Sequence, residues 1–177
     1  MGIRTVRTEG DECLRKVCQP VKSVSLSTRI LLEDMFDPMS QSGGVGLAAP
    51  QIGVLKRIVV MDTDDNQHVL INPQILGVSG EQTGYEGCLS IPGKSGIVTR
   101  PDYVKVKALN ERGEEYVLEG EGLLARCICH ECDHLDGILY SDKAEGGLIN
   151  NEDLPEDEEE ELYEDAYEEF TEEEIHK

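Results

Sequence analysis

The fold prediction for this chain depends most on the stretch HECDH, residues 130–134. The stretch places His130 and His134 four positions apart, with Glu131 directly after the first histidine. On a helix, residues four apart lie on one face, so both imidazole rings would reach the same point beside the glutamate carboxylate. This is the HExxH arrangement, in which two histidines hold a metal ion and the glutamate takes a proton from an activated water. An ordinary polar helix with two solvent-facing histidines is the alternative.

A catalytic metal site of this kind also needs a third protein ligand and an open position. One class of zinc peptidases continues the pattern with a third histidine, but Tyr140 stands at that place here. Another class uses a downstream glutamate; Glu152 is near a suitable distance but opens an acidic tail. Cys88, in EGCLS (86–90), is the better candidate, because a thiolate is a strong ligand for divalent first-row metals. A buried core thiol is the alternative for Cys88.

Three further cysteines, Cys127, Cys129 and Cys132, form a C-x-C-x-x-C pattern on the same predicted helix. The pattern is compatible with a second metal or an iron–sulfur site, but helical spacing puts only Cys127 on the face of His130. One centre could collect all three thiols only if the helix were broken. We therefore expect Cys127 to line the pocket and Cys129 and Cys132 to pack in the core.

A compact segment rich in small residues, GGVGLAAPQIG (43–53), contains the skeleton of a dinucleotide fingerprint. That match is weak, because a predicted helix precedes it and Pro50 prevents a helix from following directly. Small residues also let the backbone approach a ligand closely. Gln51 would then donate a hydrogen bond into the site from a rigid loop, although an ordinary loop amide is the alternative.

Hydrophobic periodicity and turn signals predict both helices and strands. The HExxH helix is expected over residues 121–135, with Gly137 in the C-cap position. An earlier helix is expected to begin at Ser25 or Ser27 and to end at about Pro38. Strand-like runs cover residues 57–61, 68–73, 95–100, 103–110 and 115–120, and the turn NERG (110–113) joins the last two.

The formal net charge of −21 is concentrated at the C-terminal end. Residues 151–177 hold fifteen acidic side chains against one lysine, a net charge of −14, which leaves −7 for residues 1–150. We therefore predict one domain over residues 1–150 and an acidic tail over 151–177. Nucleic acid is not expected as a partner, because phosphate binding requires clustered lysine and arginine. In the tail, the spacing of Leu162, Ala166 and Phe170 favours an amphipathic helix that covers part of the core over docking to a basic partner.

The chain carries no signal that would direct it out of the cytoplasm. Its first ten residues, MGIRTVRTEG, lack the apolar segment of a signal peptide, and no apolar run is long enough to span a membrane. We therefore expect a cytoplasmic protein without a membrane partner, whose six cysteines are thiols or metal ligands. The sequence contains no signal for an oligomeric state.

Three stretches follow one another in a fixed order along the chain: GVGLAAPQ (44–51), EGCLS (86–90) and CHECDHLDG (129–137). Together they resemble the peptide deformylase family, which is marked by GxGLAAPQ, EGCLS and QHExDHLxG in this order. Each motif alone is modest, but all three at these separations form a specific match. With IRTV near the start and LINPQIL (70–76), the resemblance extends over about residues 3 to 143.

The resemblance implies an α+β fold in which mixed or antiparallel strands pack around a central HExxH helix. It implies one divalent metal ion held by Cys88, His130 and His134, usually Fe(II), with Zn, Ni and Co also compatible with these ligands. It implies a hydrolase that removes the formyl group from N-formylmethionine at the start of new polypeptides. In that reaction a metal-activated water attacks the formyl carbon, and Glu131 acts first as base and then as acid.

The resemblance also implies roles for residues around the metal. The Gln51 side-chain amide and the backbone N–H of Leu89 would stabilise the tetrahedral oxyanion. The expected substrate contacts are Val45, Leu123 and Cys127 around an apolar methionine pocket, and backbone at Gly46 and Gly87 along an extended peptide.

Around these motifs the chain both follows and departs from the family. Glu86 and Arg100 resemble a structural ion pair, and Asp133 would orient a neighbouring group. Cys129 replaces the usual glutamine before HExxH, and TGYEGC (83–88) differs from the usual aliphatic residue and two acids before the cysteine. Some members dock on the ribosome through a basic C-terminal helix, but ribosomal RNA would repel this acidic tail, so that partner is not expected.

Two other functions are weighed against a formyl hydrolase. A zinc peptidase of the HExxH type would need the third ligand that Tyr140 replaces, and Cys88 also argues against it. A non-catalytic metal-binding protein on the same fold would have no need of Glu131 or Gln51, the two residues that catalysis requires.

Overall fold

Two α-helices and eight strands lie within residues 4–156, the part of the chain that this computed structural model describes. One sheet has five strands in the order β1-β2-β3-β6-β7, and a second has three in the order β4-β5-β8. Every pair of neighbouring strands is antiparallel, so the α+β prediction is confirmed, with antiparallel sheets. The strands are β1 (Gly46–Ala48), β2 (Ile58–Thr63), β3 (Asn66–Ser79), β4 (Gln82–Cys88), β5 (Ile91–Arg100), β6 (Tyr103–Leu109), β7 (Glu115–Glu121) and β8 (Glu145–Asn150).

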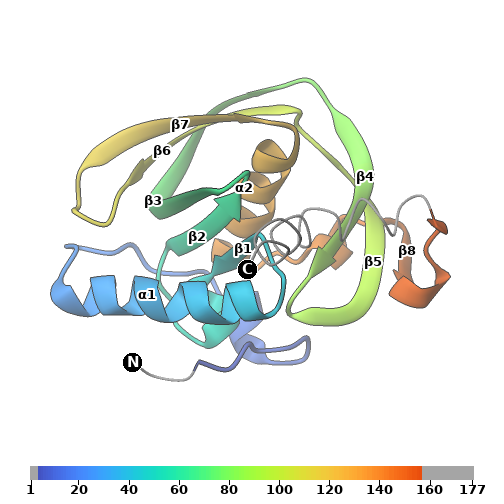
Figure 1. Ribbon diagram of the computed structural model, residues 1–177, viewed down its shortest axis with the longest axis horizontal. Helices are drawn as coiled ribbons and strands as arrows, with labels where there is room; N and C mark the ends of the chain where they lie inside the picture. Colours follow the sequence, from blue (N-terminus) through green and yellow to red (C-terminus); the bar gives the residue numbers. More distant parts are fainter. Residues whose placement is uncertain (1–3, 157–177) are drawn as a thin grey trace, which may run out of the picture.

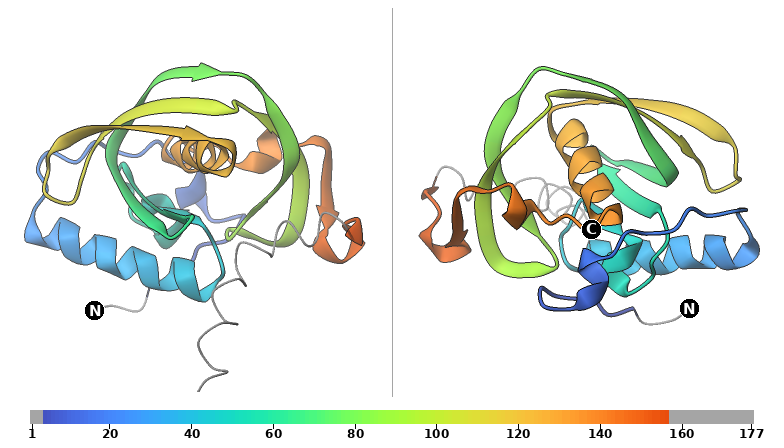
Figure 2. Two further views of the ribbon diagram at one scale, coloured as in Figure 1. Left: turned by 45° about the horizontal axis from the view of Figure 1, so that its top comes forward. Right: turned by 180° about the vertical axis from the view of Figure 1, so that it is seen from behind.

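Helix α2 (Gly122–Leu135) lies at the centre, and the strands curve around it. The left view in Figure 2 looks nearly along this helix and shows the strands enclosing it. Its apolar side packs on the five-stranded sheet, where Ile128 is fully buried with Met61 and Val104. Cys129 and Cys132 belong to the same cluster, which confirms the prediction that they pack in the core.

Helix α1 (Leu26–Gln41) covers the other face of the five-stranded sheet, beside β1 and β2 (Figure 1). Strand β2 is therefore buried on both faces: Val59 packs on the α2 side and Val60 on the α1 side. Burial on both faces explains why this strand reads as the continuous apolar run IVVM rather than as an alternating pattern.

The boundaries of α1 differ from the prediction at one end. Ser25 is the N-cap and its Oγ accepts a hydrogen bond from the Thr28 N–H at 3.3 Å. The helix continues past Pro38 to Gln41, so the predicted end was three residues short. Pro38 has no N–H to donate to the carbonyl four residues earlier, but its own carbonyl still accepts from the Ser42 N–H at 3.1 Å, so the helix continues for one more turn.

Strands β1, β4 and β8 were not predicted, whereas the other five correspond to predicted runs, and the hairpin of β6 and β7 has the expected turn. The missed strands lack the usual signal because β4 contains Gly84 and Gly87, β8 contains two adjacent glycines, and β1 has only three residues. Two of them, β1 and β4, border the site described below.

Gly137 terminates α2 immediately after the second histidine. It has φ +74°, and the Gly137 and Ile138 N–H groups donate to His134 and Asp133 carbonyls at 3.2 and 3.0 Å. This is a Schellman arrangement, and the helix ends where the sequence predicted from glycine at this position, with Asp136 as the C-cap residue. A Cβ here would also lie 2.5 Å from the Arg15 carbonyl oxygen, so two separate constraints require glycine.

Gly137→Ala is expected to reduce the free energy of unfolding by about 3 kcal/mol, from backbone strain plus the clash with Arg15. Gly146→Ala is the matched control, because Gly146 has φ +75° but nothing within 4 Å of a built Cβ. That variant should lose only the strain, about 1–2 kcal/mol. Equal losses in urea unfolding would contradict the close packing of Arg15 on the end of α2.

Two predictions concern residues at or beyond the described range. The tail helix with Leu162, Ala166 and Phe170 lies outside the described residues, and the division after residue 150 stays a prediction. Within residues 4–156, no helix has the length and apolar character needed to cross a membrane.

Candidate metal centre and active site

Helix α2 carries three of the predicted site residues on one buried face. His130, Glu131 and His134 are 8%, 4% and 1% exposed. The i,i+4 spacing brings the two imidazole rings together, with ring centroids 5.0 Å apart. An ionisable group buried to this extent needs a partner or a bound cation, so the face is chemically distinct from the apolar side of the same helix.

Cys88 comes to the histidines from the end of β4. The register of β4 and β5 shifts between Gly87 and Cys88: Gly87 pairs with Ser95 and Cys88 with Ile91, so residues 92–94 of β5 have no partner on β4 beside the thiol. The Cys88 Sγ lies 3.4 Å from His134 Nε2, and the donor atoms of Cys88, His130 and His134 all lie within 4.8 Å of one another. Among the described residues, these three form the one group of histidine, cysteine and acidic side chains that meets this spacing.

The two rejected positions for a third ligand have other surroundings. Tyr140 is buried and its ring stacks on His130 with centroids 5.9 Å apart, while its hydroxyl donates to the Lys94 carbonyl. Glu152 lies in a short 3-10 turn (Asn151–Asp153) and is exposed. Neither belongs to the group of candidate metal ligands.

The donor set fits a divalent metal ion by its chemistry. Burial and the nearby His130 hold the pKa of His134 well below its usual value, so this ring is neutral and one of its nitrogens has a free electron pair. Burial would also lower the pKa of His130, but hydrogen bonds with Cys88 and Glu86 outweigh it and raise that pKa well above the usual value. Negative groups around the His130 ring thus favour a positive charge beside it, which a metal ion would supply.

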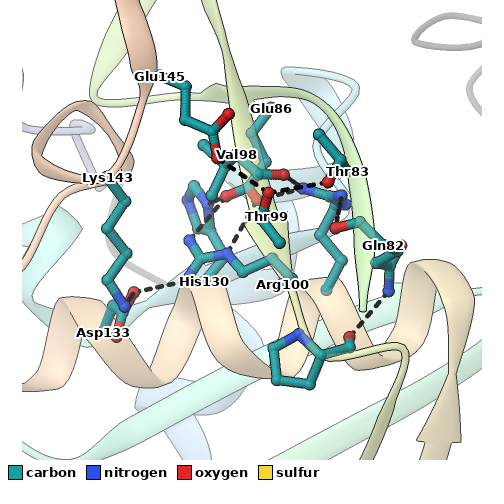
Figure 3. A network of polar contacts seen from close by, with 12 residues as sticks. Gln82, Thr83, Glu86, Val98, Thr99, Arg100, His130, Asp133, Lys143 and Glu145 are labelled. Carbon is teal, nitrogen blue, oxygen red and sulfur yellow. Dashed lines mark hydrogen bonds and ion pairs between the residues drawn. The ribbon is translucent and has the colours of Figure 1, made fainter. Parts of the chain in front are cut away.

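Glu86 fixes which nitrogen of His130 faces the cysteine. Its Oε1 lies 2.6 Å from His130 Nδ1, so Nε2 is the ring atom left for a ligand (Figure 3). Arg100 donates two hydrogen bonds to the Glu86 carboxylate, at 2.9 and 2.8 Å, which confirms the predicted ion pair. Burial alone would raise the pKa of Glu86, but the bonds from Arg100 and His130 hold it well below its usual value.

Asp133 extends this network to the protein surface. Its carboxylate accepts from Arg100 Nη1 at 2.6 Å and pairs with Lys143 at 2.9 Å (Figure 3). The neighbouring group that Asp133 orients is therefore Arg100. The chain of contacts from Asp133 through Arg100 and Glu86 to His130 holds the imidazole in one orientation.

Arg126 is a partner of Glu86 that the sequence analysis missed. Its Nη1 donates to Glu86 Oε2 at 2.6 Å and to the Val98 carbonyl at 3.1 Å. Arg126 lies four residues before His130 on α2, so the same i,i+4 rule that grouped the histidines could have found it. The Arg126 guanidinium packs beside Gly84, the glycine in TGYEGC: a Cβ built on Gly84 would lie 3.6 Å from Arg126 Nη2.

Glu86→Gln is expected to weaken metal binding by about 10–100-fold, because glutamine carries no charge to support His130. Competition with a chelating dye would measure the affinity for Zn(II). Glu145→Gln is the matched control, since Glu145 is exposed and accepts only from Thr99 in the same network. Unchanged affinity in Glu86→Gln would remove the role of this carboxylate in orienting His130.

Glu131 faces the cavity next to the candidate ligands. Burial raises its pKa to about 7. Its Oε2 is buried and has no hydrogen-bond partner among the described residues. Gly46 approaches it so closely that a built Cβ would lie 2.6 Å from Glu131 Oε1 and 2.8 Å from Cys127 Sγ. The glycine in GVGLAAPQ therefore allows β1 to lie directly against the carboxylate.

One cavity of about 530 Å³ joins the residues that the sequence singled out. All five expected substrate contacts line it, although Leu123 is 36% exposed and lies at the rim. Its lining also includes residues that the sequence analysis did not select, because they come from loops and strand ends remote in sequence. The principal ones are Val6, Tyr85, Lys94 and Asn151.

Gln51 and Leu89 border the same cavity from two different segments. Gln51 lies in a 3-10 turn (Ala49–Ile52) and is 1% exposed. Its Oε1 accepts from the Ala48 N–H at 2.9 Å, and its Nε2 lies 3.6 Å from Cys88 Sγ. Leu89 lies in the turn between β4 and β5, where a built Cβ at Gly44 would meet its side chain at 2.9 Å.

Comparisons with known proteins agree with this geometry. Residues 3–147 match the sequence model of a family described as polypeptide deformylase. A peptide deformylase of Agathobacter rectalis is 57% identical over 148 residues, covering 84% of this chain and 94% of that relative. One from Lachnoclostridium phytofermentans is 52% identical, covering 90% and 100%. The crystal structure of the Thermotoga maritima peptide deformylase superposes with a TM-score of 0.80 at 38% identity, covering 82% of this chain and 99% of that one.

Proposed function

The chain belongs to the peptide deformylase family, whose reaction is removal of the N-formyl group from new polypeptides, and we propose that it does so at the centre formed by Cys88, His130, His134 and Glu131. One observation carries this proposal. A thiol and two imidazoles that could hold a metal converge within 4.8 Å beside a buried carboxylate, and Cys88, His130 and Glu131 border a cavity that Gln51 and Leu89 also line.

Cys88, His130 and His134 would hold one divalent metal ion, and Fe(II) is the ion we propose. When bound, such an ion supplies Lewis acidity and lowers the pKa of a coordinated water towards neutrality. The protein's own contribution is to keep the donors in place: Cys88 is held at the end of β4 by its pairing with Ile91, and Glu86 orients the His130 ring.

Glu131 is the proposed proton carrier. It takes a proton from the water that attacks the formyl carbon and returns it to the amine that leaves. A pKa of about 7 suits both transfers at neutral pH, because a carboxylate near its pKa can accept and release a proton with little cost. The close approach of Gly46 restricts where this carboxylate can lie.

Gln51 and Leu89 are the proposed donors to the oxyanion. The Gln51 side-chain amide and the Leu89 backbone N–H border the cavity from two sides of Cys88. Such donors stabilise the charge that develops on the formyl oxygen in the transition state. Because Gln51 is buried and its amide is held by Ala48 and Ser90 before substrate arrives, little reorganisation of this donor accompanies the reaction.

The remaining cavity residues would bind the substrate. The apolar wall for the methionine side chain would be formed by Val45, Leu123 and Cys127. Cys127 suits an apolar wall because burial raises its pKa well above the usual value and keeps the thiol neutral. Gly46 and Gly87 would pair with the peptide backbone. New polypeptides in the cytoplasm are the proposed substrates.

Formate release from a formyl-methionyl peptide tests the proposed function. Protein purified without oxygen and loaded with Fe(II) or Ni(II) is expected to release one formate per peptide, and the acetyl peptide is expected to remain intact because formyl is the smallest acyl group. Absence of formate from protein with one bound metal would contradict the proposal and favour a non-catalytic metal-binding protein. Cleavage of internal peptide bonds would instead indicate a peptidase.

A further inference from the structure

Ser90 is fully buried beside the proposed oxyanion donors, and the mechanism above does not use it. It is the last residue of EGCLS, its exposed fraction is 0%, and its Oγ lies 3.2 Å from Gln51 Nε2. A hydroxyl buried without water contributes to stability only if it is hydrogen-bonded, and the Gln51 amide supplies that bond. The question is what this contact does for Gln51.

The orientation of the Gln51 amide is fixed by its neighbours. The Ala48 backbone N–H can only donate, so the Gln51 atom it meets at 2.9 Å is the oxygen and the other is the nitrogen. The nitrogen has two N–H groups in the plane of the amide. When Ser90 Oγ accepts from one of them, planarity sets the direction of the second, and that nitrogen lies 3.6 Å from Cys88 Sγ beside the metal centre.

The backbones of Gln51 and Ser90 are tied together by an independent set of contacts. The N–H of Arg7 donates to the Gln51 carbonyl at 2.6 Å, and the N–H of Glu9 donates to the Ser90 carbonyl at 2.8 Å. The Cys13 thiol adds a hydrogen bond to the Pro50 carbonyl at 3.4 Å. The segment at residues 7–9 thus contacts both loops that carry Gln51 and Leu89 and holds them beside each other.

We propose that Ser90 is a positioning residue, whose hydroxyl directs one Gln51 N–H into the site by accepting a hydrogen bond from the other. This inference rests on the proposed function for its kinetic consequence, since a directed N–H matters most when charge develops on the formyl oxygen. Loss of the Ser90 hydroxyl leaves the amide nitrogen with only its long 3.6 Å contact to Cys88 Sγ, so the amide can tilt about the Ala48 contact at its oxygen. Transition-state stabilisation then falls, whereas binding of the ground state changes little.

A double-mutant cycle in Ni(II)-loaded protein tests the kinetic claim. Ser90→Ala is expected to lower kcat about tenfold, with KM within about twofold of the wild type. In the Gln51→Ala background the same change is expected to alter kcat less than about twofold, because Ser90 acts through the amide. Equal effects of Ser90→Ala with and without Gln51 would overturn the inference. Thr63→Val, which removes a buried hydroxyl at the end of β2, is the control and should retain kcat.

Nuclear magnetic resonance of the Zn(II)-loaded protein supplies a readout that does not depend on turnover. The two Nε2–H signals of Gln51, assigned by their loss in Gln51→Ala, should shift and exchange faster with solvent in Ser90→Ala while Zn(II) affinity stays constant. Unchanged signals would overturn the inference even if kcat fell. Ser90→Gly removes the same acceptor and replaces the alanine variant should that one misfold.

The two proposals fail in different ways. Wild-type turnover with an unaffected Ser90→Ala variant would reject the positioning role and leave the deformylase reaction intact. If the wild type releases no formate but the Gln51 signals still shift in Ser90→Ala, the reaction is rejected and the contact between Ser90 and Gln51 is retained.

Discussion

Glu131→Gln is expected to lower kcat for deformylation by a factor of about 10²–10⁴ while one metal ion stays bound. The glutamine amide has nearly the volume of the carboxylate, so it fits against Gly46, but it cannot accept and return a proton. The metal ligands Cys88, His130 and His134 are unchanged in this variant. Single-turnover release of formate, measured beside metal content, separates the loss of chemistry from the loss of metal.

The matched control is Glu121→Gln, at the exposed N-cap residue of the same helix. Its side chain makes no capping hydrogen bond, so the change should leave kcat and the helix intact. If Glu131→Gln retained more than about a tenth of wild-type turnover, another group would have to carry the proton. The unpartnered Oε2 of Glu131 would then need a different explanation.

Cys88→Ala is expected to abolish stable metal binding, with affinity for Zn(II) lower by about 100-fold or more. The change removes the one sulfur donor and leaves two imidazoles, which hold divalent ions less tightly than a set of three ligands. Turnover should fall with metal content rather than through a separate effect on chemistry. Equilibrium dialysis followed by elemental analysis measures the loss directly.

Cys129→Ala is the control for thiol removal. Cys129 is buried on α2, directly before His130, but belongs to the core cluster on the other side of the helix. It should keep full metal content, with only a loss of packing stability. Stoichiometric metal in Cys88→Ala, or metal loss in Cys129→Ala, would refute the assignment of the ligands.

The part of the site carried by α2 could be predicted from the sequence because helical spacing is a local rule. The four-residue interval between His130 and His134, and glycine at 137, determine the face and the end of the helix without reference to the rest of the chain. Strand β2 was predicted for the same reason, since a run buried on both faces is apolar throughout.

Contacts between remote segments could not be predicted in this way. Arg7 and Gln51 are joined by a backbone hydrogen bond, which does not depend on the residue type and so cannot be recognised in the sequence. Tyr85 and Asn151 reach the cavity because β4 and β8 join one sheet with β5. Cys88 was selected from its neighbours EGCLS, but its distance from His134 depends on the register shift between β4 and β5. Arg126 could have been found by spacing alone and was overlooked.

We propose that one thiolate and two imidazoles of this chain bind a single metal ion. X-ray absorption at the metal edge measures which atoms coordinate that ion. For Zn(II)-loaded wild-type protein we expect one sulfur at about 2.3 Å from the metal and two imidazole nitrogens at about 2.0–2.1 Å from it. The sulfur contribution should disappear in any metal that Cys88→Ala retains. A wild-type spectrum without sulfur, or with more than one sulfur per metal, would contradict the assignment of Cys88, His130 and His134.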